Sequence, residues 1–341
     1  MSSEPAYQAP PIRPLAREDL PAVLAIDASI EGHSRRTYVE RRLAAALREP
    51  ALHAQFAACD GKGLAGYILA RVLVGEFGRS KTSLRLELVG VRPDAQRSGA
   101  GTRLFEVLEQ WAARHQIDAL RTSAHWSNAR MLGWLAAMGF RLAPEVVLGM
   151  GTDEAQPSEQ PAVTLADSNA AGRETDFGAP EANDHERMDR GVVEIRPMMP
   201  ADCQEILRID HAVTGRDRSN YIEALLAEAT EASRTRISLV GRLDGAIVGF
   251  VMARADIGDF GRTEPVAVLD AVGVDPAYGR RGIGRRLVSQ LLANVSQLQV
   301  ERVETLVRVA DPQLLGFFLS LGFTLSQRLA FVRKVGAQAH G

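Results

Sequence analysis

Two short glycine-containing segments stand directly before amphipathic stretches of this 341-residue chain, QRSGAG at 96–101 and GRRGIG at 279–284. A glycine turn at the start of a helix exposes backbone N–H groups that no carbonyl satisfies, beside the positive end of the helix dipole. Such a turn suits a phosphate or pyrophosphate, and glycine permits a positive φ and a close approach of the ligand. The two segments therefore predict two anion sites.

Two carboxylates occupy matching places ahead of these turns. Glu87 lies two residues before Val89 in the segment SLRLELVGV, and Asp270 takes the corresponding place in the second half of the chain. An amine with a pKa near 10 must lose a proton before it attacks an acyl carbon, and a carboxylate acting through water can accept that proton. Glu87 and Asp270 are therefore candidate general bases, although a lone strand carboxylate can also be solvated or ion-paired.

The chain repeats itself at a constant offset of 183 residues. Ile12-Arg13-Pro14 recurs as Ile195-Arg196-Pro197, and the segment GEFGR at 75–79 recurs as GDFGR at 258–262. Two repeats of this length predict duplicated domains rather than a solenoid. Between them, residues 151–191 lack a hydrophobic period and contain more acidic than basic residues, which is typical of a flexible linker. The expected layout is a flexible N-terminus, a first domain, a linker and a second domain, with bounds 1–11, 12–150, 151–191 and 192–336.

Each half has the same expected order of elements. In the first half an opening strand is followed by two helices, three further strands, the glycine turn with its helix, a fifth strand and a short helix. A last strand is expected to close the sheet of each half, at 142–150 and at 326–335. Strands interrupted by helices predict an α/β fold in each half, with a mixed, mostly antiparallel sheet flanked by helices.

Two familiar phosphate turns are excluded by the residues. A P-loop needs Gly-Lys-Ser/Thr, and a dinucleotide-binding turn needs a third glycine where Leu104 and Leu287 stand. The segment 96–101 instead resembles the Gln/Arg-x-x-Gly-x-Gly/Ala signature of the GNAT superfamily of acetyl-CoA-dependent N-acetyltransferases. The resemblance extends to the VGV segments before both turns, to Asn128, and to the closing MGF and LGF segments.

The resemblance implies two tandem GNAT domains that bind acetyl-CoA and release coenzyme A. It implies that the turn amides hold the pyrophosphate, that the preceding strand pairs with the pantetheine arm, and that a backbone N–H there stabilises the oxyanion. The cofactor positions implied in the first half are Val89, Gly90, Val91, Gln96, Arg97, Ser98, Gly99, Ala100, Gly101 and Asn128. Those implied in the second half are Val272, Gly273, Val274, Arg280, Arg281, Gly282, Ile283, Gly284, Arg285 and Asp311.

The second half departs from the family pattern. Gly279 replaces the Gln/Arg of the signature, and Asp311 replaces the asparagine. The arginines of the second turn can compensate with charge or can form a solvated face. Glu87 of the first half is also longer than Asp270 of the second half. The first half is therefore expected to be the more competent catalyst.

The family's usual acid, a tyrosine that protonates the leaving thiolate, is missing from both halves, where Leu135 and Phe318 stand. Tyr38 and Tyr221 are candidates for an acid or an acceptor contact, or are packing residues. In the absence of the family tyrosine, water can protonate the thiolate.

Two arginines at matching positions have two possible roles. Arg35 and Arg218 can meet an acidic acceptor, or they can pair with Asp27 and Asp210 respectively. Of the two roles, the pairing is favoured.

The composition limits the possible partners. The net charge of −2 gives no general attraction to nucleic acid, and two distant cysteines form neither a disulfide framework nor a zinc motif. No apolar run approaches the length of a membrane span, and the N-terminus does not resemble a signal peptide. We therefore expect a cytoplasmic protein without metal, membrane or nucleic-acid partners.

The predicted function is acetyl transfer from acetyl-CoA to a primary amine of a small molecule. A protein lysine or N-terminal acetyltransferase remains an alternative. A third possibility is an acyl-CoA-binding sensor in which one or both domains bind without turnover.

Overall fold

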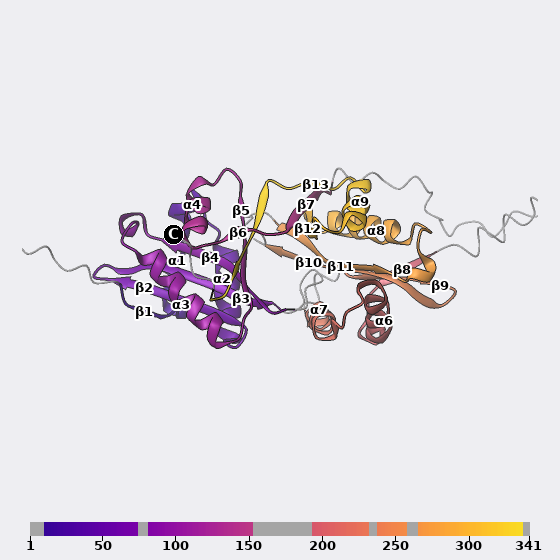
Figure 1. Ribbon diagram of the computed structural model, residues 1–341, viewed down its shortest axis with the longest axis horizontal. Coiled ribbons are helices and arrows are strands. Elements are labelled where there is room, and N and C mark those ends of the chain that lie inside the picture. Colours follow the sequence, from indigo (N-terminus) through magenta and orange to yellow (C-terminus); the bar gives the residue numbers. More distant parts are fainter. Residues whose placement is uncertain (1–9, 74–80, 153–192, 232–236, 258–264, 337–341) are drawn as a thin grey trace, which may run out of the picture. The chain divides into compact units, whose positions relative to one another are not determined.

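The computed structural model describes residues 10–73, 81–152, 193–231, 237–257 and 265–336 (Figure 1). It contains two mixed sheets of seven strands, each flanked by helices, which confirms the expected α/β fold. Most of the expected flexible N-terminus and linker, and the repeated GEFGR and GDFGR segments, lie outside the described residues.

The two halves contain corresponding elements in the same order. The strands and helices of the first half are β1 (Ile12–Pro14), α1 (Leu20–Glu31), α2 (Arg36–Arg48), β2 (His53–Asp60), β3 (Gly63–Leu73), β4 (Ser83–Val91), α3 (Ala100–Arg114), β5 (Ala119–His125), α4 (Ala129–Ala137), β6 (Arg141–Leu142) and β7 (Glu145–Gly151). Those of the second half are β8 (Glu194–Pro197), α6 (Cys203–Thr214), α7 (Ser219–Glu231), β9 (Leu239–Leu243), β10 (Ala246–Ile257), β11 (Pro265–Val274), α8 (Ile283–Gln297), β12 (Arg302–Arg308), α9 (Pro312–Ser320), β13 (Thr324–Leu325) and β14 (Arg328–Lys334).

The last strands of the two halves are exchanged. One sheet has the order β1-β2-β3-β4-β5-β14-β6, and the other has the order β13-β7-β12-β11-β10-β9-β8. Strand β14 pairs antiparallel with β5 over seven residues, from Arg328 opposite His125 to Lys334 opposite Ala119. The prediction that each last strand closes the sheet of its own half is therefore wrong. Strand propensity identifies the segment, but two repeats of one fold offer the same pairing edge, so the sequence pattern does not choose between them.

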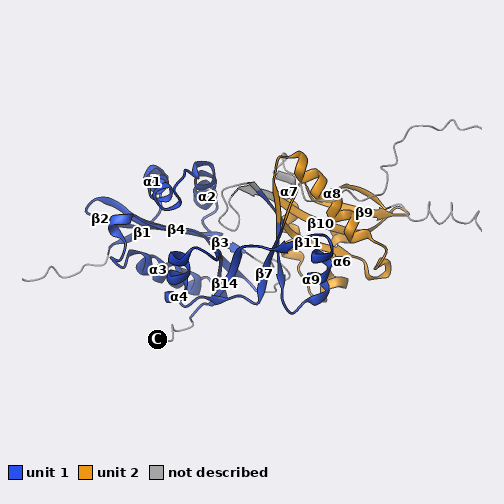
Figure 2. Cartoon of the chain, turned by 90° about the horizontal axis from the view of Figure 1, so that it is seen from above, with its two compact units in different colours: residues 1–149, 256–268, 304–341 blue, residues 150–255, 269–303 orange. Residues whose placement is uncertain are grey.

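The compact units consequently differ from the sequence repeats. One unit comprises residues 1–149, 256–268 and 304–341, and the other comprises residues 150–255 and 269–303 (Figure 2). The end of the chain belongs to the first unit because β14 lies inside the first sheet. The predicted domain boundaries 12–150 and 192–336 follow the sequence repeat and not these compact units.

The first sheet is buried on both faces, as a sheet with crossover helices requires. One face packs against α3 and α4, with Leu104, Leu108 and Phe331 in its core. The opposite face packs against α1 and α2, with Val23 and Leu43 in its core. The two helix layers hold β4 between them, and β4 carries the first candidate base.

Candidate active site

A β-bulge in β4 determines where Glu87 points. Leu88 pairs with Leu69, but the next registered pair is Leu86 with Ala70, so Glu87 is the extra residue of the bulge. Because a bulge interrupts the alternation of side chains, Leu86 packs on the α3 face while Leu88 packs on the α1–α2 face. At Glu87 the bulge therefore reverses which face of the sheet the side chains of β4 point to.

Beyond the bulge, β4 leaves its parallel neighbour. The β4–β5 ladder covers only Ser83–Arg85 of β4, opposite Ala119–Arg121 of β5. On the other edge, the N–H of Arg92 donates to the Ala65 carbonyl of β3 at 2.8 Å. Antiparallel alternation then directs the amides of Val89 and Val91 away from β3 and towards the edge that β5 has left. An extended ligand can pair with this edge.

The middle glycine of each VGV segment has a packing role. A Cβ on Gly90 would lie 2.7 Å from the Tyr67 ring, and one on Gly273 would lie 2.7 Å from the Phe250 ring. Gly90 is registered opposite Tyr67 in the neighbouring strand. These two glycines therefore make room for an aromatic ring on the sheet. The backbone amides that face the open edge are those of the flanking residues, Val89 and Val91.

The two glycine turns have the same backbone conformation. Arg97 and Gly99 have φ values of 65° and 74°, and Arg280 and Gly282 have values of 61° and 75°. Positive φ is readily adopted by glycine and costs other residues energy. In both halves the second of these positions, Gly99 or Gly282, is the N-cap of the following helix and supplies no side-chain cap.

The amides at the start of α3 precede the first helical hydrogen bond. That bond runs from the N–H of Arg103 to the carbonyl of Gly99 at 2.9 Å. The N–H groups of Ala100 and Gly101 therefore have no earlier carbonyl in the helix to donate to. In the second half the corresponding bond runs from Arg286 to Gly282 at 3.0 Å, so Ile283 and Gly284 occupy the matching places.

Side chains support the first turn from within. Gln96 Nε2 donates to the Val91 carbonyl at 3.2 Å, and the Ser98 hydroxyl donates to the Ala95 carbonyl at 2.6 Å. A Cβ on Gly101 would approach Trp134 Nε1 at 3.2 Å, so a small residue is needed there. The signature glutamine thus ties the turn to the end of β4.

The second turn is less supported and more basic. Gly279 has no side chain with which to make the bond that Gln96 makes in the first half. Arg280 and Arg281 are exposed, and the Arg281 guanidinium lies 5.3 Å from the centroid of the Tyr278 ring. Val272 and Val274 are half-buried on β11.

Asn128 and Asp311 cap equivalent helices. Asn128 Oδ1 accepts the N–H of Met131 at 3.1 Å, and Asp311 Oδ1 accepts the N–H of Leu314 at 3.1 Å. Since both side chains are good N-caps, the replacement of asparagine by aspartate preserves the capping bond of α9.

Two arginines bind the same oxygen of the Glu87 carboxylate. Arg42 Nη1 lies 3.2 Å and Arg85 Nη2 lies 3.5 Å from Oε1, and the Glu87 side chain is 3% exposed. Within the described part of the chain, no hydrogen bond reaches Oε2. The Tyr38 hydroxyl lies 3.5 Å from the backbone carbonyl of Glu87. Sequence reasoning missed both arginines, although Arg42 follows Tyr38 by four residues on the buried face of α2.

Asp270 is held differently from Glu87. Arg254 Nη1 contacts Oδ1 at 2.7 Å and Oδ2 at 2.8 Å, and the Asp270 side chain is 2% exposed. Both oxygens of Asp270 are thus engaged by protein, whereas no hydrogen bond from a described residue reaches the second oxygen of Glu87. This difference separates the two candidate bases.

The repeated arginine–aspartate pairs are internal. Arg35 Nε donates to Asp27 Oδ2 at 2.9 Å, and Arg218 Nε donates to Asp210 Oδ2 at 2.9 Å. Of the two roles considered for these arginines, the structure supports the pairing. Burial, together with the nearby Asp27 carboxylate, raises the pKa of the Tyr67 phenol.

The positions of the missing family tyrosine are apolar and enclosed. Leu135 is 0% exposed and Phe318 is 1% exposed. Tyr38 and Tyr221 are also buried, under the guanidinium groups of Arg35 and Arg218.

Over the described ranges, no cluster of His, Cys, Asp and Glu side chains is arranged to hold a metal ion. No helix in those ranges is long and apolar enough to cross a membrane.

The profile of the acetyltransferase (GNAT) family matches residues 15–140 and 202–323, which together exceed half of the chain. The chain therefore belongs to the GNAT family of acetyltransferases. Since one match falls in each repeat, the prediction of a tandem GNAT protein is confirmed. Members of this family generally use acetyl-CoA and bind an acceptor.

One relative and two solved structures extend the comparison. The N-alpha-acetyltransferase RimI of Mycobacterium tuberculosis is 38% identical over 101 residues, which are 29% of this chain and 60% of RimI. The match thus spans less than two thirds of that relative. A tandem GNAT protein from the clavulanic acid biosynthesis pathway superposes with a TM-score of 0.61 at 16% identity, covering 96% of this chain and 99% of that one. A GCN5-related N-acetyltransferase from Sphaerobacter thermophilus gives 0.59 at 17% identity, covering 95% of both chains. At these identities the two structures show a shared fold.

Proposed function

We propose that the protein is an acetyl-CoA-dependent N-acetyltransferase that acetylates a primary amine of a small molecule. The observation that carries this proposal is the open edge of β4, which leads directly into the N–H turn before α3. An extended pantetheine arm and a pyrophosphate need these two features in this order.

The first half supplies a complete set of contacts for the cofactor in this proposal. Bound acetyl-CoA supplies the thioester that is the acyl donor. The strand edge at Val89 and Val91 would pair with its extended arm, and the turn would surround its pyrophosphate with amides such as those of Ala100 and Gly101, which have no carbonyl partner in the helix. Gln96 holds the turn against β4, and Asn128 orders the start of α4 beside it. The matching residues of the second half form a second site, with Arg280 and Arg281 adding positive charge.

Glu87 is the proposed general base. Arg42 and Arg85 fix its Oε1, which leaves Oε2 to accept a proton from the substrate ammonium through a water molecule. A backbone N–H of Val89 or Val91 donates to the oxyanion. Because Leu135 stands at the family tyrosine position, water supplies the proton to the leaving thiolate. Asp270 has no oxygen outside its ion pair, so the second half is proposed to bind the cofactor with little turnover.

A second candidate function is acetylation of a protein N-terminus. The similarity to RimI, an N-alpha-acetyltransferase, favours it. Both functions need the same cofactor site and base, and they differ only in the acceptor.

Release of coenzyme A thiol by the full-length chain tests the proposal, with polyamines, amino acids, aminoglycosides and peptides as acceptors. Amine-dependent release with a small amine supports the first function, and release with peptides alone supports the second. Tight acetyl-CoA binding without release for any acceptor would contradict both and indicate a sensor.

A further inference from the structure

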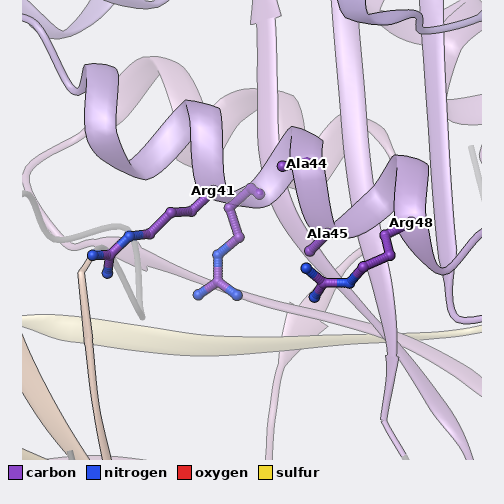
Figure 3. Close-up of a pocket in the computed structure, with 5 residues that line it drawn as sticks. Arg41, Ala44, Ala45 and Arg48 are labelled. Carbon is purple, nitrogen blue, oxygen red and sulfur yellow. The ribbon is translucent and has the colours of Figure 1, made fainter. Parts of the chain in front are cut away.

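A cavity of about 310 Å³ lies along α2. Its described lining consists of Arg41, Arg42, Ala44, Ala45 and Arg48. Figure 3 shows Arg41 and Arg48 extending from one side of the helix, with the short side chains of Ala44 and Ala45 between them. The two alanines leave room that the flanking arginines surround with positive charge.

Two of these arginines can reach a ligand without breaking a buried bond. Arg41 is exposed and makes no ion pair with any described residue. Arg48 pairs with its neighbour Glu49 at 3.1 Å, with the two side chains 72% and 42% exposed. Since exposed pairs contribute little stability, Arg48 can exchange this partner for a bound anion.

The third arginine connects the cavity to the proposed base. Arg42 lines the cavity, and its Nη1 lies 3.2 Å from Glu87 Oε1. One guanidinium therefore separates the cavity from the carboxylate. A ligand group held in the cavity would lie close to the group that is proposed to accept the amine proton.

The fold does not require these arginines. The equivalent helix of the second half, α7, carries Ala224, Leu225 and Glu231 at the positions of Arg41, Arg42 and Arg48. The second repeat thus lacks the positive charge at all three of these positions. The arginines occur in the half whose candidate base has an oxygen that no hydrogen bond from a described residue reaches.

We propose that the α2 arginines bind an acidic group of the acceptor, so that the substrate is a small amine that also carries a carboxylate or a phosphate. Guanidinium groups bind such oxyanions through paired, charge-assisted hydrogen bonds. The acidic group binds between Arg41 and Arg48, and the amine of the same molecule extends past Arg42 towards Glu87. This inference rests on the proposed function and names its substrate class.

The first test compares acceptors that differ only in charge. Coenzyme A release is measured with ω-amino acids, ω-aminoalkyl phosphates and alkylamines of graded chain length. The acidic amines are expected to have a kcat/KM about tenfold or more above that of matched alkylamines. In Arg41→Glu the preference should disappear or reverse. The control is Arg36→Glu, which makes the same charge change on the same helix outside the cavity, where Arg36 pairs with Glu40 at 3.0 Å, and which should retain the preference.

The second test does not depend on turnover. Succinate and inorganic phosphate are titrated by calorimetry into the wild type and into both variants. Binding that is lost in Arg41→Glu and kept in Arg36→Glu supports the anion site, even if no acceptor is acetylated. Which of the two anions binds more tightly identifies the acidic group. Equal kcat/KM for acidic and neutral amines, or anion binding that is insensitive to Arg41→Glu, would overturn the inference while leaving acetyl transfer intact.

Discussion

Replacing Glu87 by glutamine should lower the rate of acetyl transfer by about 100-fold or more, as expected for a lost general base. This loss corresponds to about 2.7 kcal/mol of transition-state stabilisation. Glutamine keeps an oxygen for Arg42 and Arg85, so the fold should lose only about 1–3 kcal/mol from the missing charge. The affinity for acetyl-CoA should change little, because the cofactor turn lies at residues 96–101.

Asp270→Asn is the matched substitution in the second half. Both oxygens of Asp270 contact Arg254 in the folded protein, so this change should affect stability more than turnover, with a rate within about threefold of the wild type. Coenzyme A release under saturating acetyl-CoA gives the rate, and thermal unfolding gives the stability of each variant. A dispensable Glu87 together with an essential Asp270 would refute the reasoning and move the active site to the second half.

Two further predictions concern the architecture. Cleavage within 151–191 should leave two fragments that elute together, because β14 lies between β5 and β6, and separation of the cleaved fragments would contradict the exchange. Phe331→Ala should destabilise the first sheet by about 3–5 kcal/mol. Leu325→Ala, at a 67% exposed position, should not. The Arg196 guanidinium holds the pKa of Asp202 below its ordinary value of 3.8, so the stabilising effect of this carboxylate is present above about pH 4 and is lost as the pH falls towards the lowered pKa. The difference in unfolding free energy between the wild type and Asp202→Asn should therefore shrink in acid, and an equal difference at pH 7 and pH 3 would contradict this.

Much of the fold was predictable because it depends on local patterns. The alternation in SLRLELVGV predicted a strand that the structure places at Ser83–Val91. The exchange of β7 and β14 was not predictable, because strand propensity carries no information about which of two similar edges a strand joins.

The candidate site was predictable where it depends on the backbone. The positive φ values at Gly99 and Gly282 follow from the glycine spacing. The partners of Glu87 were not found, because the bulge that turns Glu87 towards α2 arises from the register between two strands. An arginine four residues after Tyr38 on a buried helix face was the available signal for Arg42.

Calorimetric titration of the full-length chain with coenzyme A tests the central claim, that each glycine turn is a cofactor site. The wild type should bind two equivalents. Gly99→Val and Gly282→Val should each bind one, because a β-branched residue at φ near 75° strains the turn and obstructs its amides. Gly32→Val introduces the same strain at φ 78°, away from both turns, and should still bind two. Loss of a site in the Gly32 variant alone, or two full sites in the Gly99 variant, would contradict the account.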